Sequence, residues 1–327
     1  MFEEWGLLGN VLVLLVSLVI LDRASELTIN NAVKVSEISG FGKTTIGFIL
    51  IALVTTLPEL SVSVFAAVLG EGIGIAVGNV LGSNIANICL ILGAGFFIVS
   101  MKSTDRLKIV PLLAEEEVGT LYFGLFIASI VPLTLLYIGY ASRFIGILLI
   151  GIFIFYIFRL AKIKHTKNEG SLGEERSKLK RYTFLAVLGA LIVVASANFI
   201  VDSATYIATL IGVPQVVLGA TIVAFGTSLP EFANTLKSAI KGHLELALGN
   251  IVGSCFTNIT LILGVALIGS PIREDITPFT NPILFSLITN LLLWYFLSGG
   301  KISWREAAML LFMYAVFLVV SFGGYRT

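Results

Sequence analysis

Residues 78–93 read GNVLGSNIANICLILG, and residues 249–264 read GNIVGSCFTNITLILG. Ten of these sixteen positions are identical at an offset of 171 residues. A second pair of motifs precedes them: residues 55–60 read TTLPEL, and residues 227–232 read TSLPEF, at an offset of 172. Two matches at nearly one spacing predict that the chain is an internal duplication, with one copy of each motif in each half.

The composition around these motifs is that of a membrane protein. Of the 327 residues, 57% are hydrophobic and only 13% are charged, whereas soluble domains carry about 25% charged residues. Apolar stretches long enough to cross a bilayer recur from end to end. The first is expected to be retained, because Glu3 and Glu4 precede it in place of a basic signal-peptide region. We predict an all-α integral membrane protein with ten transmembrane helices, at residues 6–22, 43–69, 72–99, 119–140, 142–160, 182–208, 213–238, 243–269, 279–298 and 304–323.

The basic residues predict an orientation for these spans. With the N-terminus outside, the loops on the inner side hold 18 of the 21 Lys and Arg residues, which is the asymmetry expected of cytoplasmic loops. We therefore expect a multi-pass protein of the cell membrane, with both termini outside and a basic cytoplasmic linker at residues 161–181.

The duplication divides the ten spans into two units of five, at residues 1–160 and 182–327. Because five is odd, the second unit must enter the membrane from the opposite side. The repeats are therefore expected to be inverted and related by a pseudo-two-fold axis in the membrane plane. Substrate and ion sites of such folds lie near the midplane, where the repeats meet.

Glu59 and Glu231 lie in the middle of otherwise apolar segments, one in each half. An intramembrane carboxylate is costly and by default indicates an ion or proton pathway; the alternative is a buried Glu satisfied by a neighbour or kept protonated. Pro58 and Pro230 directly precede these glutamates. A proline inside a helix frees the carbonyl four residues earlier, and broken backbone is tolerated at membrane depth only where it lines a cavity or is buried in protein.

The second motif adds further oxygen ligands: Ser83, Asn87, Ser254 and Asn258. We expect Asn87 and Asn258 to line the ion site. Asn79, Asn84 and Asn250 are equally compatible with hydrogen bonds between helices. The glycine pairs of the two GxxxG motifs, Gly78 with Gly82 and Gly249 with Gly253, are expected to allow close helix packing.

These side chains suit hard cations. Ca²⁺ takes six to eight oxygen ligands in flexible geometry, and Na⁺ accepts similar ones. Paired Cys and His ligands are absent from the sequence, which argues against zinc or copper. Two carboxylates carry a charge of −2, which one Ca²⁺, two Na⁺ or two protons would balance. Charge alone therefore leaves sodium coupling and proton coupling open.

At these motifs the chain resembles the calcium/cation antiporter superfamily, and within it the sodium/calcium exchanger branch of the prokaryotic type, which lacks a regulatory domain. The resemblance rests on AFGTSLPE at residues 224–231, on TTLPE at residues 55–59, and on the two GNxxGS blocks that continue to Asn87 and Asn258. It implies an alternating-access antiporter that exchanges Ca²⁺ for Na⁺, with Glu59 and Glu231 as central ligands. The other ligands that it implies, through side chains or backbone carbonyls, are Thr55, Thr56, Thr227, Ser228, Ser83, Ser254, Asn87, Asn258, Ala52 and Ala224.

The sequence departs from the family's patterns in ways that bear on coupling. The potassium-dependent branch carries Asp at the position of Asn258, so the resemblance implies potassium independence. The proton/calcium branch usually has a Glu shortly after the Gly-Asn pair, whereas Val80 and Leu81 follow here. An H⁺/Ca²⁺ or other divalent cation exchanger remains the alternative.

Other functions are less favoured. A cation channel usually surrounds a symmetric pore of several chains, whereas this chain pairs its motifs within itself. No Ser–His, HExxH or GxGD arrangement indicates an enzyme. We expect no cofactor, no nucleic acid and no obligatory protein partner, only the ions and the lipid bilayer. Four polar residues fall near the ends of the first and sixth spans: Glu26, Asn30, Asn198 and Asp202. They are interpreted as solvated helix ends or vestibule contacts.

Overall fold

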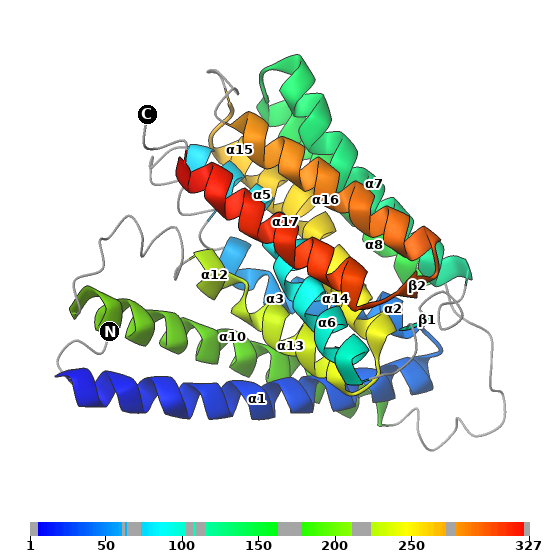
Figure 1. Ribbon diagram of the computed structural model, residues 1–327. Helices are drawn as coiled ribbons and strands as arrows, with labels where there is room; N and C mark the ends of the chain where they lie inside the picture. Colours follow the sequence, from blue (N-terminus) through cyan, green and yellow to red (C-terminus); the bar gives the residue numbers. More distant parts are fainter. Residues whose placement is uncertain are drawn as a thin grey trace.

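The computed structural model describes residues 6–60, 63, 73–102, 107–108, 115–162, 178–210, 224–272 and 279–323 (Figure 1). The fold is all-helical, as predicted, apart from two strands of two residues each. With η marking π-helical stretches, the helices in chain order are α1 (Gly6–Ser39), α2 (Lys43–Ile46), η2 (Gly47–Ile51), α3 (Ala52–Thr55), α5 (Ile73–Ile85), η3 (Ala86–Leu92), α6 (Gly93–Lys102), α7 (Glu115–Ile138), α8 (Arg143–Lys162), α10 (Leu179–Leu210), α12 (Ala224–Thr227), α13 (Leu229–Ile240), α14 (Leu244–Thr257), η6 (Asn258–Ile262), α15 (Leu263–Gly269), α16 (Thr280–Ser298) and α17 (Trp304–Gly323).

Eight helical segments in the described part of the chain are individually long and apolar enough to cross a membrane. The two expected spans that do not meet this criterion are the second and the seventh. Both are interrupted, after Thr55 and after Thr227, and both continue beyond the described residues. The two expected spans that do not meet the length criterion are therefore the ones that carry the Pro-Glu motifs.

The prediction for the first span was wrong in extent. We expected a helix at residues 6–22, but α1 continues to Ser39 as one helix of 34 residues. The charged side chains that end the apolar run do not end the helix, because they are paired: Lys237 Nζ lies 2.7 Å from Asp22 Oδ1, and Lys241 Nζ lies 2.9 Å from Glu26 Oε1. Lys241 also donates to Asn30 Oδ1 at 2.7 Å.

The first helices of the two halves, α1 and α10, lie side by side, and the other helices form a bundle that crosses this pair at an angle (Figure 1). Their contact is close at Gly189, where a Cβ atom would lie 2.6 Å from Thr28 Oγ1. Because this space holds no side chain, α10 can approach the backbone of α1.

Short strand pairings connect the two halves at their loops. Strand β1 (Leu107–Lys108), after the third span, pairs antiparallel with β2 (Lys301–Ile302), between the ninth and tenth spans. A single bridge likewise joins Ala141, between the fourth and fifth spans, to Ile272, after the eighth. In both pairings, the segment after the third span of one half meets the loop between the fourth and fifth spans of the other half. A pseudo-two-fold relation between the halves predicts this pattern.

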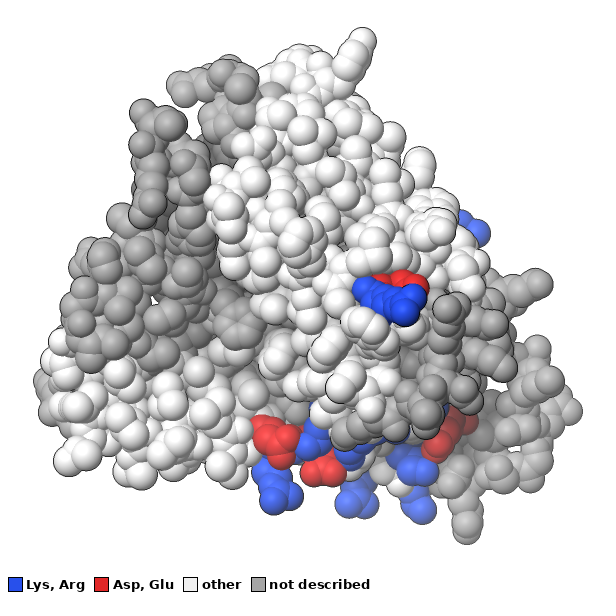
Figure 2. All heavy atoms as spheres, in the orientation of Figure 1, with Lys and Arg blue, Asp and Glu red and all other residues white. Residues whose placement is uncertain are grey.

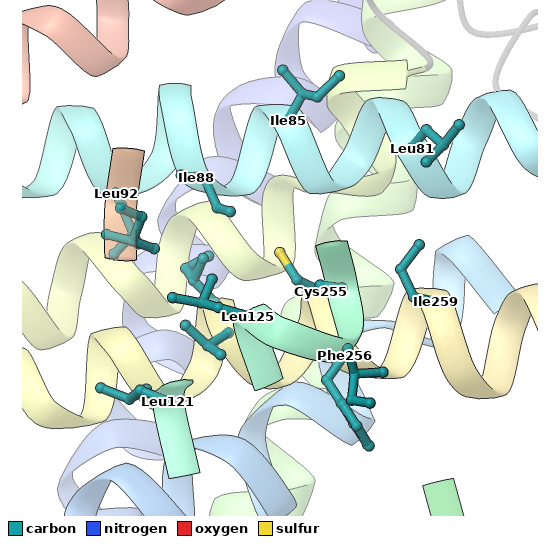
Figure 3. Close-up of a cluster of buried hydrophobic side chains, with 14 of the residues drawn as sticks. Leu81, Ile85, Ile88, Leu92, Leu121, Leu125, Cys255, Phe256 and Ile259 are labelled. Atoms are coloured by element: carbon teal, nitrogen blue, oxygen red, sulfur yellow. The ribbon is translucent and has the colours of Figure 1, made fainter. Parts of the chain in front are cut away.

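The core is formed by helices from both halves. Figure 3 shows side chains of α5 and η3 (Leu81, Ile85, Ile88, Leu92) with Leu121 and Leu125 of α7 and with Cys255, Phe256 and Ile259 of the α14–η6 helix. All are almost completely buried. A continuous apolar core of this kind holds α5 and α14, which carry the GNxxGS motifs, in fixed positions.

The two GxxxG motifs differ in their contacts among the described residues. A Cβ atom at Gly249 would lie 2.1 Å from the Thr44 carbonyl oxygen, and one at Gly253 would lie 2.8 Å from Phe48 Cα. The packing role predicted for this pair is confirmed. At Gly78 and Gly82, by contrast, an added Cβ would meet no atom of the described residues within 4 Å, so the packing role of the first motif stays a prediction. The matching partners by the repeat offset, Val216 and Ala220, lie outside the described residues.

The visible surface agrees with a protein embedded in lipid. Figure 2 shows most of the coloured Lys, Arg, Asp and Glu side chains along the lower edge and one cluster on the face right of centre, with a broad white surface above them. Large apolar side chains such as Leu8, Phe155 and Phe312 are more than half exposed. Such a surface is stable when its solvent is a bilayer.

Candidate ion-binding site

Both Pro-Glu motifs lie at breaks in their helices. Helix α3 ends at Thr55, and Thr56 has φ −80° and ψ 5°. Helix α12 ends at Thr227, and Ser228 has φ −91° and ψ 6°. The prolines follow in the first turn of the next helical segment, where a missing N–H is tolerated because that position has no intrahelical partner. Sequence reasoning placed the break correctly, and the two halves repeat its geometry.

The two carboxylates are fully buried and close enough to interact electrostatically. Ser228 Oγ, from the second half, donates to Glu59 Oε1, from the first, at 3.2 Å. In the opposite direction, the Thr55 side chain lies beside the Glu231 carboxylate, and Ser254 Oγ donates to Glu231 Oε1 at 3.4 Å. The second oxygen of each carboxylate, Oε2, has no partner among the described residues.

The two asparagines expected to line the site lie at π-helical turns. Asn87 is in η3, Asn258 begins η6, and both are fully buried. The Oδ1 atoms of both residues, and Nδ2 of Asn87, have no hydrogen-bond partner among the described residues. π-helical turns inside α-helices are rare and occur frequently at functional sites. The sequence carried no signal from which we could predict them.

Contacts across the centre of the molecule relate the halves to each other. Asn84 and Cys255 occupy equivalent positions, and they meet: Asn84 Nδ2 donates to the Cys255 carbonyl at 3.3 Å. Asn258 Nδ2 donates to Asn84 Oδ1 at 3.0 Å, and the equivalent Asn87 lies beside Cys255. A residue that meets its own counterpart lies on the axis that relates two copies. The interhelical bonding considered for Asn84 is therefore present.

Among the remaining predicted ligands, the two threonines before Glu59 have hydroxyls that are hydrogen-bonded within their own helix. Thr56 Oγ1 donates to the Ala52 carbonyl at 2.9 Å, and Thr55 Oγ1 approaches the same oxygen at 3.3 Å. The Ala52 carbonyl oxygen is therefore already hydrogen-bonded within its own helix in this conformation. Ser83 is buried, Thr227 is partly buried, and Ala224 begins α12 with a side chain outside the described set.

Asn79 and Asn250 form hydrogen bonds between helices, which was one of the two interpretations of these residues. Asn79 Nδ2 donates to the Glu59 carbonyl at 3.2 Å and to Ser63 Oγ at 3.1 Å. Asn250 Nδ2 donates to Thr235 Oγ1 at 2.9 Å. Ser63 and Thr235 are equivalent positions, so each half has the same bond between its Pro-Glu helix and its GNxxGS helix. These bonds position the carboxylates.

The candidate site therefore brings together two carboxyl groups and several neutral hydroxyl and amide groups. In the described part of the chain, no three His, Cys, Asp or Glu side chains gather as they would in a transition-metal centre. Such a donor set fits hard cations, and two ionised carboxylates would balance the charge of one divalent or two monovalent ions.

Asn234 was not selected by sequence reasoning. It lies on α13 one turn after Glu231, is fully buried, and has no partner for either amide atom among the described residues. Its spacing of three residues from Glu231 is the signal that could have indicated it.

Comparisons with known proteins agree with this geometry. A sequence model of the sodium/calcium exchanger protein family matches residues 9–162 and 181–323. The sodium/calcium exchanger MaX1 of Methanosarcina acetivorans is 33% identical and covers 96% of this chain and 98% of its own length. The inner membrane protein YrbG of Escherichia coli is 29% identical over 79% of this chain and 84% of its own.

The fold is also that of a solved exchanger. The sodium-calcium exchanger NCX_Mj soaked with Na⁺ and without Ca²⁺ superposes with a TM-score of 0.83, at 24% identity, over 96% of this chain and 99% of that one. The same exchanger soaked with Na⁺ and Sr²⁺ gives a TM-score of 0.81 at 25% identity. A match to the family over nearly the whole chain identifies it as a transporter and not an enzyme: the chain belongs to the sodium/calcium exchanger family.

Proposed function

We propose that this protein is a secondary antiporter that exchanges Ca²⁺ for Na⁺ across a membrane by alternating access. One observation carries the proposal: Glu59 and Glu231, one from each half, are buried at matching helix breaks, and each has an oxygen without a partner in the described part of the chain. A single Ca²⁺ balances their charge in one state, and two Na⁺ balance it in another. The two ions therefore compete for one site, which is the minimum requirement for exchange.

The neutral ligands favour sodium over protons as the coupling ion. A proton needs only the carboxylate oxygen that it binds, whereas Na⁺ must replace its hydration shell with several oxygen atoms. Asn87, Asn258, Ser254 and Ser228 supply such atoms within the same buried region. The relative MaX1 carries the name of a sodium/calcium exchanger. In this proposal the ligands are the twelve residues predicted from the sequence, with Ala52 and Ala224 acting through their carbonyls.

Potassium independence is part of the proposal, and the surroundings of Asn258 support it. The Asn258 Nδ2 donor meets Asn84 Oδ1, whose own amide nitrogen is held by the Cys255 carbonyl. A carboxylate at position 258 would therefore face an acceptor oxygen. This contact suits a neutral amide, so the site keeps a charge of −2 and needs no additional K⁺.

The orientation remains that predicted from the basic residues. Both termini would lie outside, and the linker at residues 161–181 would lie in the cytoplasm with the Lys237 and Lys241 end of α13.

Calcium uptake into proteoliposomes, with one imposed gradient at a time, tests the proposal. We expect an outward Na⁺ gradient to drive uptake of radioactive Ca²⁺, a pH gradient to drive it poorly, and K⁺ to have no effect while the membrane potential is held at zero. Strong drive by a pH gradient with no effect of Na⁺ would establish the H⁺/Ca²⁺ alternative. Calcium flux with no counter-ion gradient would indicate a channel.

A further inference from the structure

Asn234 is buried without an evident structural reason. Its side chain is 0% exposed, and neither Nδ2 nor Oδ1 has a hydrogen-bond partner among the described residues. Leaving a buried amide unpaired is costly, and the usual explanation in a native protein is a water molecule or an ion at that point. Asn250 of α14 is bonded through Nδ2 to Thr235, the residue after Asn234, and its Oδ1 has no hydrogen-bond partner among the described residues.

Asn234 belongs to a polar stripe that leads from the ion site to one end of α13. Glu231, Asn234, Thr235 and Ser238 recur at helical spacing, and all four are buried. The stripe ends at Lys241, which directly follows α13 and contacts α1 through Glu26 and Asn30. A continuous row of polar groups thus joins the fully buried Glu231 to the charged end of the molecule.

The first half has no such stripe. At the equivalent positions of its Pro-Glu segment, the sequence after Glu59 reads Val62, Ser63, Ala66 and Leu69, in place of Asn234, Thr235, Ser238 and Lys241. Three of the four positions are apolar. The halves otherwise match closely around the carboxylates, so in sequence the polar stripe is a feature of the second half alone.

We propose that Asn234, with the free oxygen of Asn250, forms a transit site for the transported cation on the side of the site that faces Lys241. Its ligands are neutral, so it holds a partly hydrated cation weakly and does not strip a divalent ion of its water. It has no counterpart in the first half, so the two routes to Glu59 and Glu231 differ. The inference rests on the proposed antiport function and adds a one-sided route to it.

Thiol labelling tests the route independently of transport. Asn234→Cys is treated in proteoliposomes with a charged, membrane-impermeant methanethiosulfonate reagent, and the native chain, with its buried Cys89 and Cys255, is the baseline. Asn290→Cys is the matched control, because Asn290 on α16 is also a buried amide without partners among the described residues. The exposed residue Lys34, replaced by Cys, reports which face of the protein the reagent meets.

We expect Asn234→Cys to react from the face that carries Lys241, to be protected by Na⁺ or Ca²⁺, and to react poorly from the other face. Asn290→Cys should stay unmodified from both faces. An unreactive Asn234→Cys, or equal labelling of the two variants, would overturn the inference.

Replacing Asn234 with valine, the residue at the equivalent position of the first half, provides the second test. Asn234→Val should raise the Na⁺ concentration for half-maximal exchange roughly five- to tenfold on the Lys241 face, the effect of losing one contact of ordinary strength. Half-saturation on the other face, and calorimetric Ca²⁺ affinity in detergent, should stay within about twofold. Equal changes on both faces would assign Asn234 a structural role only. If the native protein failed to exchange Ca²⁺, the proposed function would fall, while the labelling pattern would still decide whether the route exists.

Discussion

Replacing Glu231 with Gln removes one of the two charges at the centre of the site and keeps the shape of the side chain. The carboxylate is fully buried and interacts with Glu59, and among the described residues no third carboxylate lies with them. Removing one partner of a buried ionic interaction costs about 3–5 kcal/mol. Each 1.4 kcal/mol is a factor of ten, so we expect Ca²⁺ affinity to fall roughly a hundred- to several-thousand-fold.

The same change should affect the two ions differently. With Glu231→Gln the site keeps a charge of −1, which still matches one Na⁺, so Na⁺ affinity should fall less than Ca²⁺ affinity. The ion-free protein should unfold at an equal or higher temperature, because the variant removes the repulsion between two buried carboxylates. A loss of binding that came from misfolding would instead lower the unfolding temperature.

Isothermal titration calorimetry with Ca²⁺ in sodium-free detergent solution measures the effect. Glu26→Gln is the control, since this partly exposed carboxylate pairs with Lys241 outside the site. Exposed ion pairs contribute at most about 1 kcal/mol, so its Ca²⁺ affinity should change less than about fivefold. Unchanged Ca²⁺ affinity in a folded Glu231→Gln variant would refute the assignment of this residue as a ligand.

Two further predictions concern stability. Gly249→Ala would place a methyl group 2.1 Å from the Thr44 carbonyl oxygen, so we expect a loss of at least about 1–3 kcal/mol and a lower unfolding temperature. Gly151→Ala, at an exposed position of α8, should change stability little, and equal losses in the two variants would contradict the packing described. Burial, and secondarily the nearby Lys43, lower the pKa of His243. Its contribution to stability is therefore present above about pH 6.5 and is lost as the pH falls through the lowered pKa. We expect His243→Asn to flatten the fall of the unfolding temperature between about pH 7.5 and 5.5, and an unchanged slope would exclude this residue as the cause.

The sequence was sufficient for features that depend on local pattern. Hydropathy and the motif offset predicted the all-helical membrane class and the duplication. Pro58 and Pro230, each before a glutamate, predicted the helix breaks, because the missing N–H acts on its own helix and requires no knowledge of distant residues. Burial of Glu59 and Glu231 followed from their apolar surroundings.

Features that depend on distant partners could not be predicted in this way. Helix α1 continues past Asp22 because that side chain meets Lys237, which lies 215 residues away in the sequence. Gly249 packs against Thr44, which lies 205 residues earlier in the chain, and the GNxxGS motif alone does not reveal this partner. The π-helical turns at Asn87 and Asn258 reflect the packing of their helices against others, and hydropathy carries no information about them.

The contact between Asn84 and Cys255 has a consequence for how such a chain can evolve. In a symmetric dimer of one ancestral repeat, the residue at this position would face an identical copy of itself, and both copies would have to make the same contact. Fusion of the copies into one polypeptide lets the two positions diverge. Here one became an amide, and the other became a small thiol whose backbone carbonyl accepts its bond. The two positions that meet on the pseudo-two-fold axis can therefore hold different residues because the halves are covalently linked. Replacing them with one identical residue, as two equal halves would require, should be hardest at this contact.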